Sequence, residues 1–251
     1  MFDAVVLAGG GKPEPLTEQE QVSNKAFILV NGRPLLAYIL KALQEAASIN
    51  KIVVVGPDEE LRQLNEEGYN FEPVQERGSM LDNLAAGFES VDRERQCLVV
   101  TADIPLINAS IIETFLGLCE PHDHDLYYPI LDKEACVRHF PETERTYVRL
   151  KEGRVTGGNV GLVNPGWYLQ NKARLEMFIS YRKKPVKLLR ILPLTLVLKY
   201  LFKQLGVRDL ELFLSRLLNL KAKAVPCSLV ELGLDVDKIS DLAVVKQALK
   251  G

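Results

Sequence analysis

Short apolar runs alternate with amphipathic segments along the first hundred residues of the chain. The apolar runs have the length of buried strands, and the segments between them place apolar side chains at helical spacing. The strand-like runs are residues 4–7, 52–55, 71–74 and 97–102. The helix-like segments are residues 35–47, which follow Pro34, and residues 58–67 and 79–91. This order predicts βαβ units in which the four strands are parallel.

The alternation continues less regularly through the second half of the chain. Ser110 and Glu113 have the spacing of a capping box, which predicts the start of a helix there. The polar segment 132–145 is expected to be an exposed excursion. Further strands are expected at residues 126–130, 146–150, 160–163 and 234–236, and a last helix at residues 240–249. The whole pattern is that of a sheet wound with helices.

Residues 167–220 depart from this alternation and have the pattern of an almost continuous helical region. The apolar stretch 188–202 is interrupted by Arg190, Pro193 and Lys199, and residues 210–220 form a second one. Both are shorter than the ~18 apolar residues that a membrane-spanning helix needs. The region is therefore predicted to be a helical insertion, packed on the sheet or against a second copy of the chain, with attachment to a lipid surface as the alternative.

Composition and charge narrow the range of binding partners to expect. The 251 residues, 47% of them apolar, are predicted to form one α/β domain over residues 1–251, with the insertion at about 167–220. A formal charge of −2 and the lack of a basic stretch with interleaved aromatics favour small molecules over nucleic acid. Four scattered cysteines without a C-x-x-C pair indicate reduced thiols, and the first residues lack a secretory signal pattern. A cytoplasmic location is expected.

The first apolar run leads directly into Gly9, Gly10 and Gly11. A buried strand that ends in glycines brings bare backbone N–H groups to the carboxyl edge of a sheet, where a phosphate can bind. The pattern favours a nucleotide site, with a plain turn as the alternative. Because the spacing is not G-x-G-x-x-G and Pro13 and Pro15 follow, a dinucleotide oxidoreductase is disfavoured.

Three aspartates are candidates for a metal site. Asp103 follows the apolar run 97–102, at the strand end where ligands bind in open α/β sheets. Asp235 and Asp237 alternate with Leu234 and Val236, so strand geometry would direct both carboxylates to one side. Unpaired buried carboxylates are costly, and hard oxygen ligands favour Mg²⁺, particularly where phosphates complete its shell. A turn or cap role is the alternative for Asp103.

Six motifs in order resemble the GT-A-type nucleotidyltransferases, close to the molybdenum-cofactor guanylyl- and cytidylyltransferases, the MobA-like NTP transferases, and to the sugar-phosphate nucleotidyltransferases. The motifs are residues 7–10, 24–26 with 30–35, 78–83, 101–106, 157–160 and 235–237. The resemblance implies a three-layer α/β/α, Rossmann-like fold with a mainly parallel mixed sheet. It also implies transfer of NMP from an NTP to a phosphorylated or hydroxyl-bearing acceptor, with release of pyrophosphate and dependence on Mg²⁺.

The resemblance carries over to particular residues. It implies that Lys25 and Asp103 are catalytic and that Asp103 and Asp237 hold the magnesium ion. The implied nucleotide-binding residues are Leu7, Ala8, Gly9, Gly10, Gly11, Lys12, Lys25, Ser79, Asn83, Ala102 and Asp103. Gly157, Gly158 and Asn159 are candidates for binding the acceptor, because glycines admit close backbone contact and an amide can hydrogen-bond a hydroxyl or phosphate, with a bulged turn as the alternative.

One position departs from the pattern of that family. Glu14 stands about where an arginine is usual, and a carboxylate there would repel a triphosphate. Lys12 supplies a charge nearby, although it lacks the forked geometry of a guanidinium. Two other functions therefore stay open: a non-catalytic nucleotide-binding module, and a GT-A glycosyltransferase that uses an NDP-sugar.

The position of the helical insertion also suggests a role. It lies between the candidate acceptor loop and Asp235, so we expect it to cover the acceptor or to form a homodimer contact, rather than to belong to the nucleotide half. Basic residues at its leading edge suit an acidic acceptor or anionic lipid headgroups. These residues are Arg182, Lys183, Lys184, Lys187 and Arg190.

Overall fold

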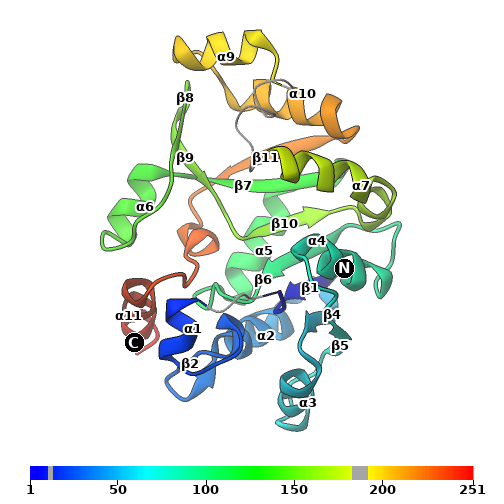
Figure 1. Cartoon of the computed structure of the whole chain (residues 1–251), viewed down its shortest axis with the longest axis vertical. Coiled ribbons are helices and arrows are strands. Elements are labelled where there is room, and N and C mark those ends of the chain that lie inside the picture. Colours follow the sequence, from blue (N-terminus) through cyan, green and yellow to red (C-terminus); the bar gives the residue numbers. More distant parts are fainter. Residues whose placement is uncertain (11–13, 183–191, 251) are drawn as a thin grey trace.

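The fold is built on one nine-stranded mixed sheet with the order β5-β4-β1-β6-β10-β7-β9-β8, and β11 pairs with β7 (Figure 1). The structure is a computed structural model that describes residues 1–10, 14–182 and 192–250. The strands of the sheet are β1 (Phe2–Leu7), β4 (Ile49–Gly56), β5 (Glu72–Gln75), β6 (Cys97–Thr101), β7 (Leu126–Asp132), β8 (Val148–Leu150), β9 (Gly153–Gly157), β10 (Val160–Val163) and β11 (Ala222–Cys227). A small separate sheet pairs β2 (Leu29–Val30) with β3 (Arg33–Pro34).

Four neighbouring strands, β5, β4, β1 and β6, are parallel, as the alternating pattern predicts. Ala4, Val5 and Val6 of β1 are fully buried because helices cover both faces of this half of the sheet. One face packs against α2 (Leu35–Glu45), α3 (Asp58–Glu66) and α5 (Ala109–Leu118). The other face packs against α4 (Met80–Glu89) and α7 (Pro165–Arg182). The result is a three-layer α/β/α arrangement.

The second half of the sheet begins with β10, which is antiparallel to both β6 and β7. Strand β7 therefore runs parallel to β6, and both strands end at the same edge of the sheet. The last residues of β7, Ile130 to Asp132, pair with β9, and β9 forms a hairpin with β8. On its other side β7 pairs in parallel with β11, a strand that the apolar pattern did not reveal.

Two local expectations from the sequence were wrong, and a third was incomplete. Residues 234–236 are not a strand but an irregular segment after the 3-10 helix η2 (Val230–Gly233), held to the sheet by the 2.9 Å bond from Val236 N to Asp103 O. Segment 132–145 is largely exposed, as expected, but it also contains α6 (Lys133–His139), which Asp132 caps through two backbone N–H groups. Helix α5 is capped by Asn108, which accepts from the N–H of Ile111, instead of the predicted capping box.

The helical region consists of α7, α9 (Leu194–Leu201) and α10 (Val207–Leu218) among the described residues. Tyr168 of α7 donates to Leu81 O of α4 at 2.9 Å, and its ring meets Phe88 edge-on. Helix α7 thus packs on α4 beside the sheet, as expected of an insertion packed on the sheet, and the role of an acceptor cover stays a prediction. Among the described helices, none has the length and apolarity of a membrane span. Lys183, Lys184, Lys187 and Arg190 lie outside the described residues.

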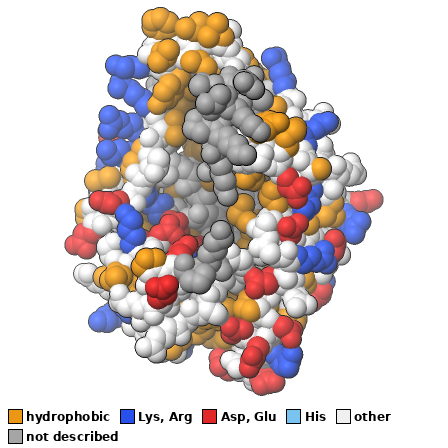
Figure 2. Space-filling view, in the orientation of Figure 1, with side chains coloured by type: hydrophobic (Ala, Val, Ile, Leu, Met, Phe, Trp, Pro, Cys, Tyr) orange, Lys and Arg blue, Asp and Glu red, His pale blue; other side chains and the backbone are white. Residues whose placement is uncertain are grey.

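A smaller core cluster and an exposed helix complete the fold. The helices α1 (Pro15–Gln19) and α11 (Ile239–Ala248) pack with Leu234 and Val236 in a separate core. Helix α9 has no buried residue, and Figure 2 shows apolar side chains gathered over this end of the molecule. Its most exposed apolar residues are Leu194, Leu201 and Phe202, the last directly following the helix. The four cysteines are free thiols.

Candidate active site

The glycine loop begins where β1 ends at the carboxyl edge of the sheet. Ala8 N donates to Val55 O at 2.8 Å, and Leu7 O accepts from Ala102 N at 3.1 Å, so the loop leaves the sheet between β4 and β6. Gly10 has a φ of +85°, a conformation that favours glycine. The structure therefore places Leu7, Ala8, Gly9, Gly10 and Ala102 at one edge, as predicted, whereas Gly11 and Lys12 lie outside the described residues.

A carboxylate that the sequence did not single out contacts this loop. Glu76 Oε2 accepts from Gly10 N at 2.5 Å, and a Cβ at Gly9 would overlap the Glu76 side chain. Glu76 directly follows β5, the neighbour of β4, which is the position that brings it to this edge. The bare N–H group expected to meet an anion is thus paired with a side chain here.

Asn83 faces the same loop from α4. Its side chain is buried, and its Oδ1 accepts from Arg77 N at 2.6 Å. Its Nδ2 is buried without a hydrogen-bond partner in the described part of the chain, and it lies 3.1 Å from where a Cβ at Gly9 would be. Such an unsatisfied donor is costly unless a ligand accepts from it. Ser79, in contrast, is exposed and caps α4, where its Oγ accepts from Asp82 N.

Three carboxylates meet beside the end of β6. Asp103, Asp235 and Asp237 each offer an oxygen, and these oxygens lie within 4.8 Å of one another. Asp103 Oδ1 is buried and has no hydrogen-bond partner among the described residues. The alternation in residues 234–237 directs both later carboxylates to this point, as predicted, even though the segment is not a strand. Asp235 is thus a third candidate ligand, beyond the implied pair of Asp103 and Asp237.

The crowding of negative charge changes the proton affinity of these groups. Burial, together with the charges of Asp237 and Asp103, raises the pKa of Asp235 to about 6, although Arg145 Nη2 lies 3.3 Å from its Oδ1. Burial would also raise the pKa of Asp237, but the hydrogen bond and charge of Lys25 outweigh it and lower that pKa. A bound cation would relieve the repulsion between carboxylates that contributes to the raised pKa of Asp235.

Lys25 supplies positive charge to the same cluster. It opens the 3-10 helix η1 (Lys25–Phe27), which Asn24 caps by accepting from Ala26 N at 2.9 Å. Its Nζ lies 2.5 Å from Asp237 Oδ1 and 3.5 Å from Asp103 Oδ2. Burial disfavours the charged amine, but these carboxylates outweigh it and raise the pKa of Lys25, so the side chain stays protonated.

Glu14 is a fourth carboxylate near Lys25. It precedes α1, is about half exposed, and has its Oε2 3.8 Å from Lys25 Nζ. The carboxylate that departs from the family pattern is therefore directed at the lysine. A triphosphate bound beside Lys25 would meet the charge of Glu14 unless that side chain moves, which its exposure allows.

The candidate acceptor loop joins the acidic cluster through backbone bonds. Asn159 O accepts from Thr101 N at 3.1 Å, and Asn159 N donates to Leu232 O at 2.7 Å. The loop is thus held between the end of β6 and η2, the two elements that precede Asp103 and Asp235. A Cβ at Gly157 would overlap the ring of the exposed Tyr128, so a larger residue here would displace that side chain whatever the acceptor.

Gly158 provides a test of that packing. A Cβ at Gly158 would lie 2.9 Å from Pro129 Cγ and 3.0 Å from the backbone oxygen of Leu232, which cannot swing away. Gly158→Ala is expected to lower the free energy of unfolding by about 1–3 kcal/mol, measured by urea denaturation. Gly117→Ala, with nothing within 4 Å in the exposed part of α5, is the matched control and should raise it by about 0.5–1 kcal/mol. Equal effects at both positions would contradict the packing argument.

Curated proteins with related sequences share part of the chain. The 2-C-methyl-D-erythritol 4-phosphate cytidylyltransferase of Clostridium beijerinckii is 34% identical over 113 residues, which are 45% of this chain and 44% of that protein. The 2-phospho-L-lactate guanylyltransferase of Methanocaldococcus vulcanius is 33% identical over 90 residues, 36% of this chain and 41% of that protein. The chain matches less than half the length of each of these relatives.

A solved structure matches nearly the whole chain. It is described as a hypothetical transferase from Thermus thermophilus, has a TM-score of 0.83 and 33% identity, and the match covers 96% of this chain and 100% of that one. The Rossmann-like fold expected from the sequence is confirmed. The sequence profile of the MobA-like NTP transferase domain matches residues 4–197, well over half of the chain. The protein therefore belongs to the MobA-like NTP transferase family, as its motifs predicted.

Proposed function

We propose that the protein transfers NMP from an NTP to a small-molecule acceptor and releases pyrophosphate, in a reaction that requires Mg²⁺. The observation that carries this proposal is the meeting of Lys25 with Asp103 and Asp237 at the sheet edge where the glycine loop also begins. A protonated lysine beside a set of carboxylates can neutralise a triphosphate and also hold a cation. Positioning and charge stabilisation are most of what phosphoryl chemistry needs from a protein.

The residues at this edge suit distinct parts of the reaction. The backbone of Gly9 and Gly10 would hold the phosphates, once Glu76 leaves the Gly10 N–H. Lys25 would stabilise negative charge as the acceptor oxygen attacks the α-phosphorus and pyrophosphate leaves. Asn159 would hydrogen-bond the acceptor. A phosphate acceptor is ionised at neutral pH, so the attacking oxygen needs no general base.

The donor set at the cluster fits a magnesium ion. Hard carboxylate oxygens are the ligands Mg²⁺ prefers, and the buried, unpartnered Oδ1 of Asp103 is an atom that a cation would satisfy. Asp103 and Asp237 would hold the ion, with Asp235 as a third candidate. When bound, Mg²⁺ would neutralise phosphate oxygens of the substrate.

The acceptor is proposed to be a phosphorylated small molecule. The two curated relatives are named for reactions on 2-C-methyl-D-erythritol 4-phosphate and 2-phospho-L-lactate, both of which carry a phosphate. Their matches cover less than half of each protein, so the acceptor class is extended to this chain as part of the proposal. The expected homodimer, lipid contact and cytoplasmic location stay predictions, and the exposed apolar side chains of α9 are the surface where such contacts would form.

Asn83 is predicted to bind the nucleotide through its unsatisfied Nδ2. Asn83→Asp keeps the acceptor for Arg77 N but replaces the donor near Gly9 by an oxygen. We expect the dissociation constant for the preferred NTP, measured by calorimetric titration, to rise about tenfold or more. The variant loses one hydrogen bond to the nucleotide and adds a carboxylate that repels it. The exposed Asn70 gives the matched control Asn70→Asp, which should bind as the wild type does. Unchanged binding by the Asn83 variant would remove this residue from the site.

The proposal as a whole is tested by measuring pyrophosphate. The protein is incubated with each NTP, Mg²⁺ and a panel of phosphorylated acceptors, with and without chelator. Release that needs both an acceptor and Mg²⁺ supports nucleotidyl transfer. Binding of an NTP without release under any condition would favour the non-catalytic module, for which Glu14 beside Lys25 is the structural argument. Turnover of an NDP-sugar instead would establish the glycosyltransferase alternative.

A further inference from the structure

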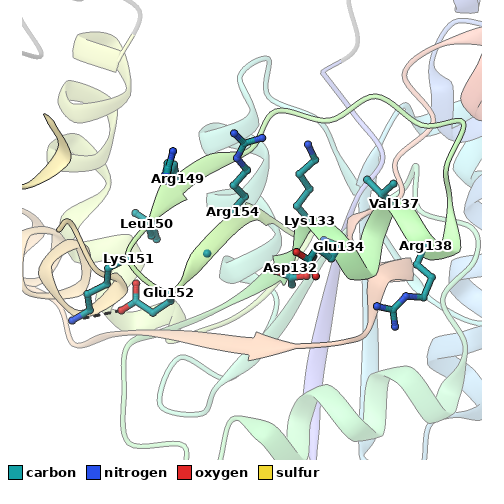
Figure 3. A pocket seen from close by; sticks show the side chains of 11 residues that line it. Asp132, Lys133, Glu134, Val137, Arg138, Arg149, Leu150, Lys151, Glu152 and Arg154 are labelled. Atoms are coloured by element: carbon teal, nitrogen blue, oxygen red, sulfur yellow. Dashed lines mark hydrogen bonds and ion pairs between the residues drawn. The ribbon is translucent and has the colours of Figure 1, made fainter. Parts of the chain in front are cut away.

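A group of basic side chains lies away from the glycine loop and the acidic cluster. It surrounds a hollow of about 950 Å³ between α6 and the hairpin of β8 and β9. Figure 3 shows Arg149, Arg154 and Lys133 side by side, with their charged ends extending in the same direction. A hollow of this volume is in the range of small-molecule sites.

The two arginines are placed at an energetic cost. Arg149 of β8 and Arg154 of β9 are directly opposite each other in the antiparallel hairpin, where side chains on one face are close neighbours. Like charges in such a pair repel, and neither guanidinium forms an ion pair with a carboxylate of the described chain. An acid opposite one of these arginines would stabilise the hairpin better. An anion between the two guanidinium groups would remove the repulsion.

The acidic residues around the hollow do not supply that anion. Asp132 Oδ1 accepts from the N–H groups of Glu134 and Ala135 and is used in capping α6. The carboxylate of Glu152 accepts from Val207 N at the start of α10 and lies 3.8 Å from Lys151. Both of these carboxylates are engaged by the protein, and the third acid of the lining, the exposed Glu134, forms no ion pair with either arginine in the described part of the chain. The positive charge of the two arginines is left for a ligand.

From this arrangement we infer that the hollow between α6 and the β8–β9 hairpin binds a small molecule that carries two or more phosphate groups. One phosphate would lie between Arg149 and Arg154, because a guanidinium donates in pairs to phosphate oxygens. Lys133, which packs over the Tyr147 ring at 5.6 Å, would reach a second phosphate. The inference does not depend on the proposed function, since neither the glycine loop nor the acidic cluster contributes to this site.

The test is to titrate the protein with inorganic tripolyphosphate at low ionic strength and to measure the binding by calorimetry. The variant Arg149→Gln/Arg154→Gln is compared with Lys41→Gln/Arg62→Gln, which removes the same charge from exposed pairs on α2 and α3. We expect the first variant to bind at least about tenfold more weakly than the wild type, and the control to bind as the wild type does. Binding by the wild type should also weaken as salt rises.

Two further measurements keep the result interpretable. The melting temperature of ligand-free Arg149→Gln/Arg154→Gln should be no lower than that of the wild type, because the change removes a repulsion, and this excludes unfolding as the cause of lost binding. The titration is repeated with a non-hydrolysable NTP and Mg²⁺ present, so that any nucleotide site is filled. The inference is overturned if the wild type does not bind tripolyphosphate under that condition, or if the arginine variant and the control lose the same amount.

Discussion

Asp103→Asn is expected to lower nucleotidyl transfer by about three orders of magnitude, with little change in stability. The change removes one charge from the carboxylate that ends β6, while an amide of nearly the same shape stays in place. Electrostatic groups at a reacting phosphate typically account for effects of this size. Initial rates of pyrophosphate release, measured across a range of Mg²⁺ concentrations, give the loss and show whether more metal restores activity.

The matched control is Asp58→Asn, at an exposed aspartate in the first turn of α3. It should keep the wild-type rate. Asp237→Asn is expected to behave like Asp103→Asn, and Asp235→Asn tests whether the third carboxylate belongs to the same unit. Wild-type Mg²⁺-dependent turnover in both Asp103→Asn and Asp237→Asn would show that the metal has been assigned to the wrong residues.

Three strands in the first half of the sheet, β1, β4 and β6, could be predicted because they are largely buried on both faces. Such strands have continuous apolar runs, and residues 4–7 and 97–102 were recognised for this reason. Strand β11 was missed because Lys223 and Pro226 break the apolar pattern. Among the described residues it pairs with β7 alone, and a proline is tolerated in a strand that has a free side. The apolar pattern therefore predicts strands that are buried on both faces well, and it misses strands interrupted by polar residues, such as β9 and β11.

At the candidate site, an acid that follows a buried apolar strand was easier to find than an acid whose contact also depends on a loop. Asp103 was recognised because an acid directly after a buried strand is unusual in composition and position. Glu76 was not, because its contact with Gly10 depends on the loop that Gly78, with a φ of +103°, and the Asn83–Arg77 bond hold in shape. That conformation arises from tertiary contacts, which a pattern of apolar and polar residues does not contain.

Replacing Lys25 by methionine is expected to lower turnover by about two to three orders of magnitude, and to weaken NTP binding by less than about tenfold. Methionine keeps most of the side-chain stem but removes the charge that lies 2.5 Å from Asp237 Oδ1. The loss should fall mainly on turnover, because negative charge near the lysine increases as the α-phosphorus is attacked. Rates and NTP affinities are measured on the same preparations.

Lys199→Met is the control for the loss of an ion pair alone. Lys199 lies 2.6 Å from Asp209 between α9 and α10, so this variant breaks a comparable pair and should keep full turnover. Equal losses of turnover and NTP affinity in Lys25→Met would instead make Lys25 a residue that binds the ground state.

The same variant separates the two ways in which the carboxylates can be neutralised. In the ligand-free protein Lys25 provides the nearest positive charge to Asp103 and Asp237, so a divalent cation that binds these groups is repelled by the ammonium group. Lys25→Met should therefore bind Mn²⁺ about tenfold more tightly than the wild type in the absence of nucleotide, as measured by electron paramagnetic resonance, although it turns over more slowly. Weaker Mn²⁺ binding in this variant would mean that the three carboxylates are positioned to pair with Lys25 and not to bind a metal.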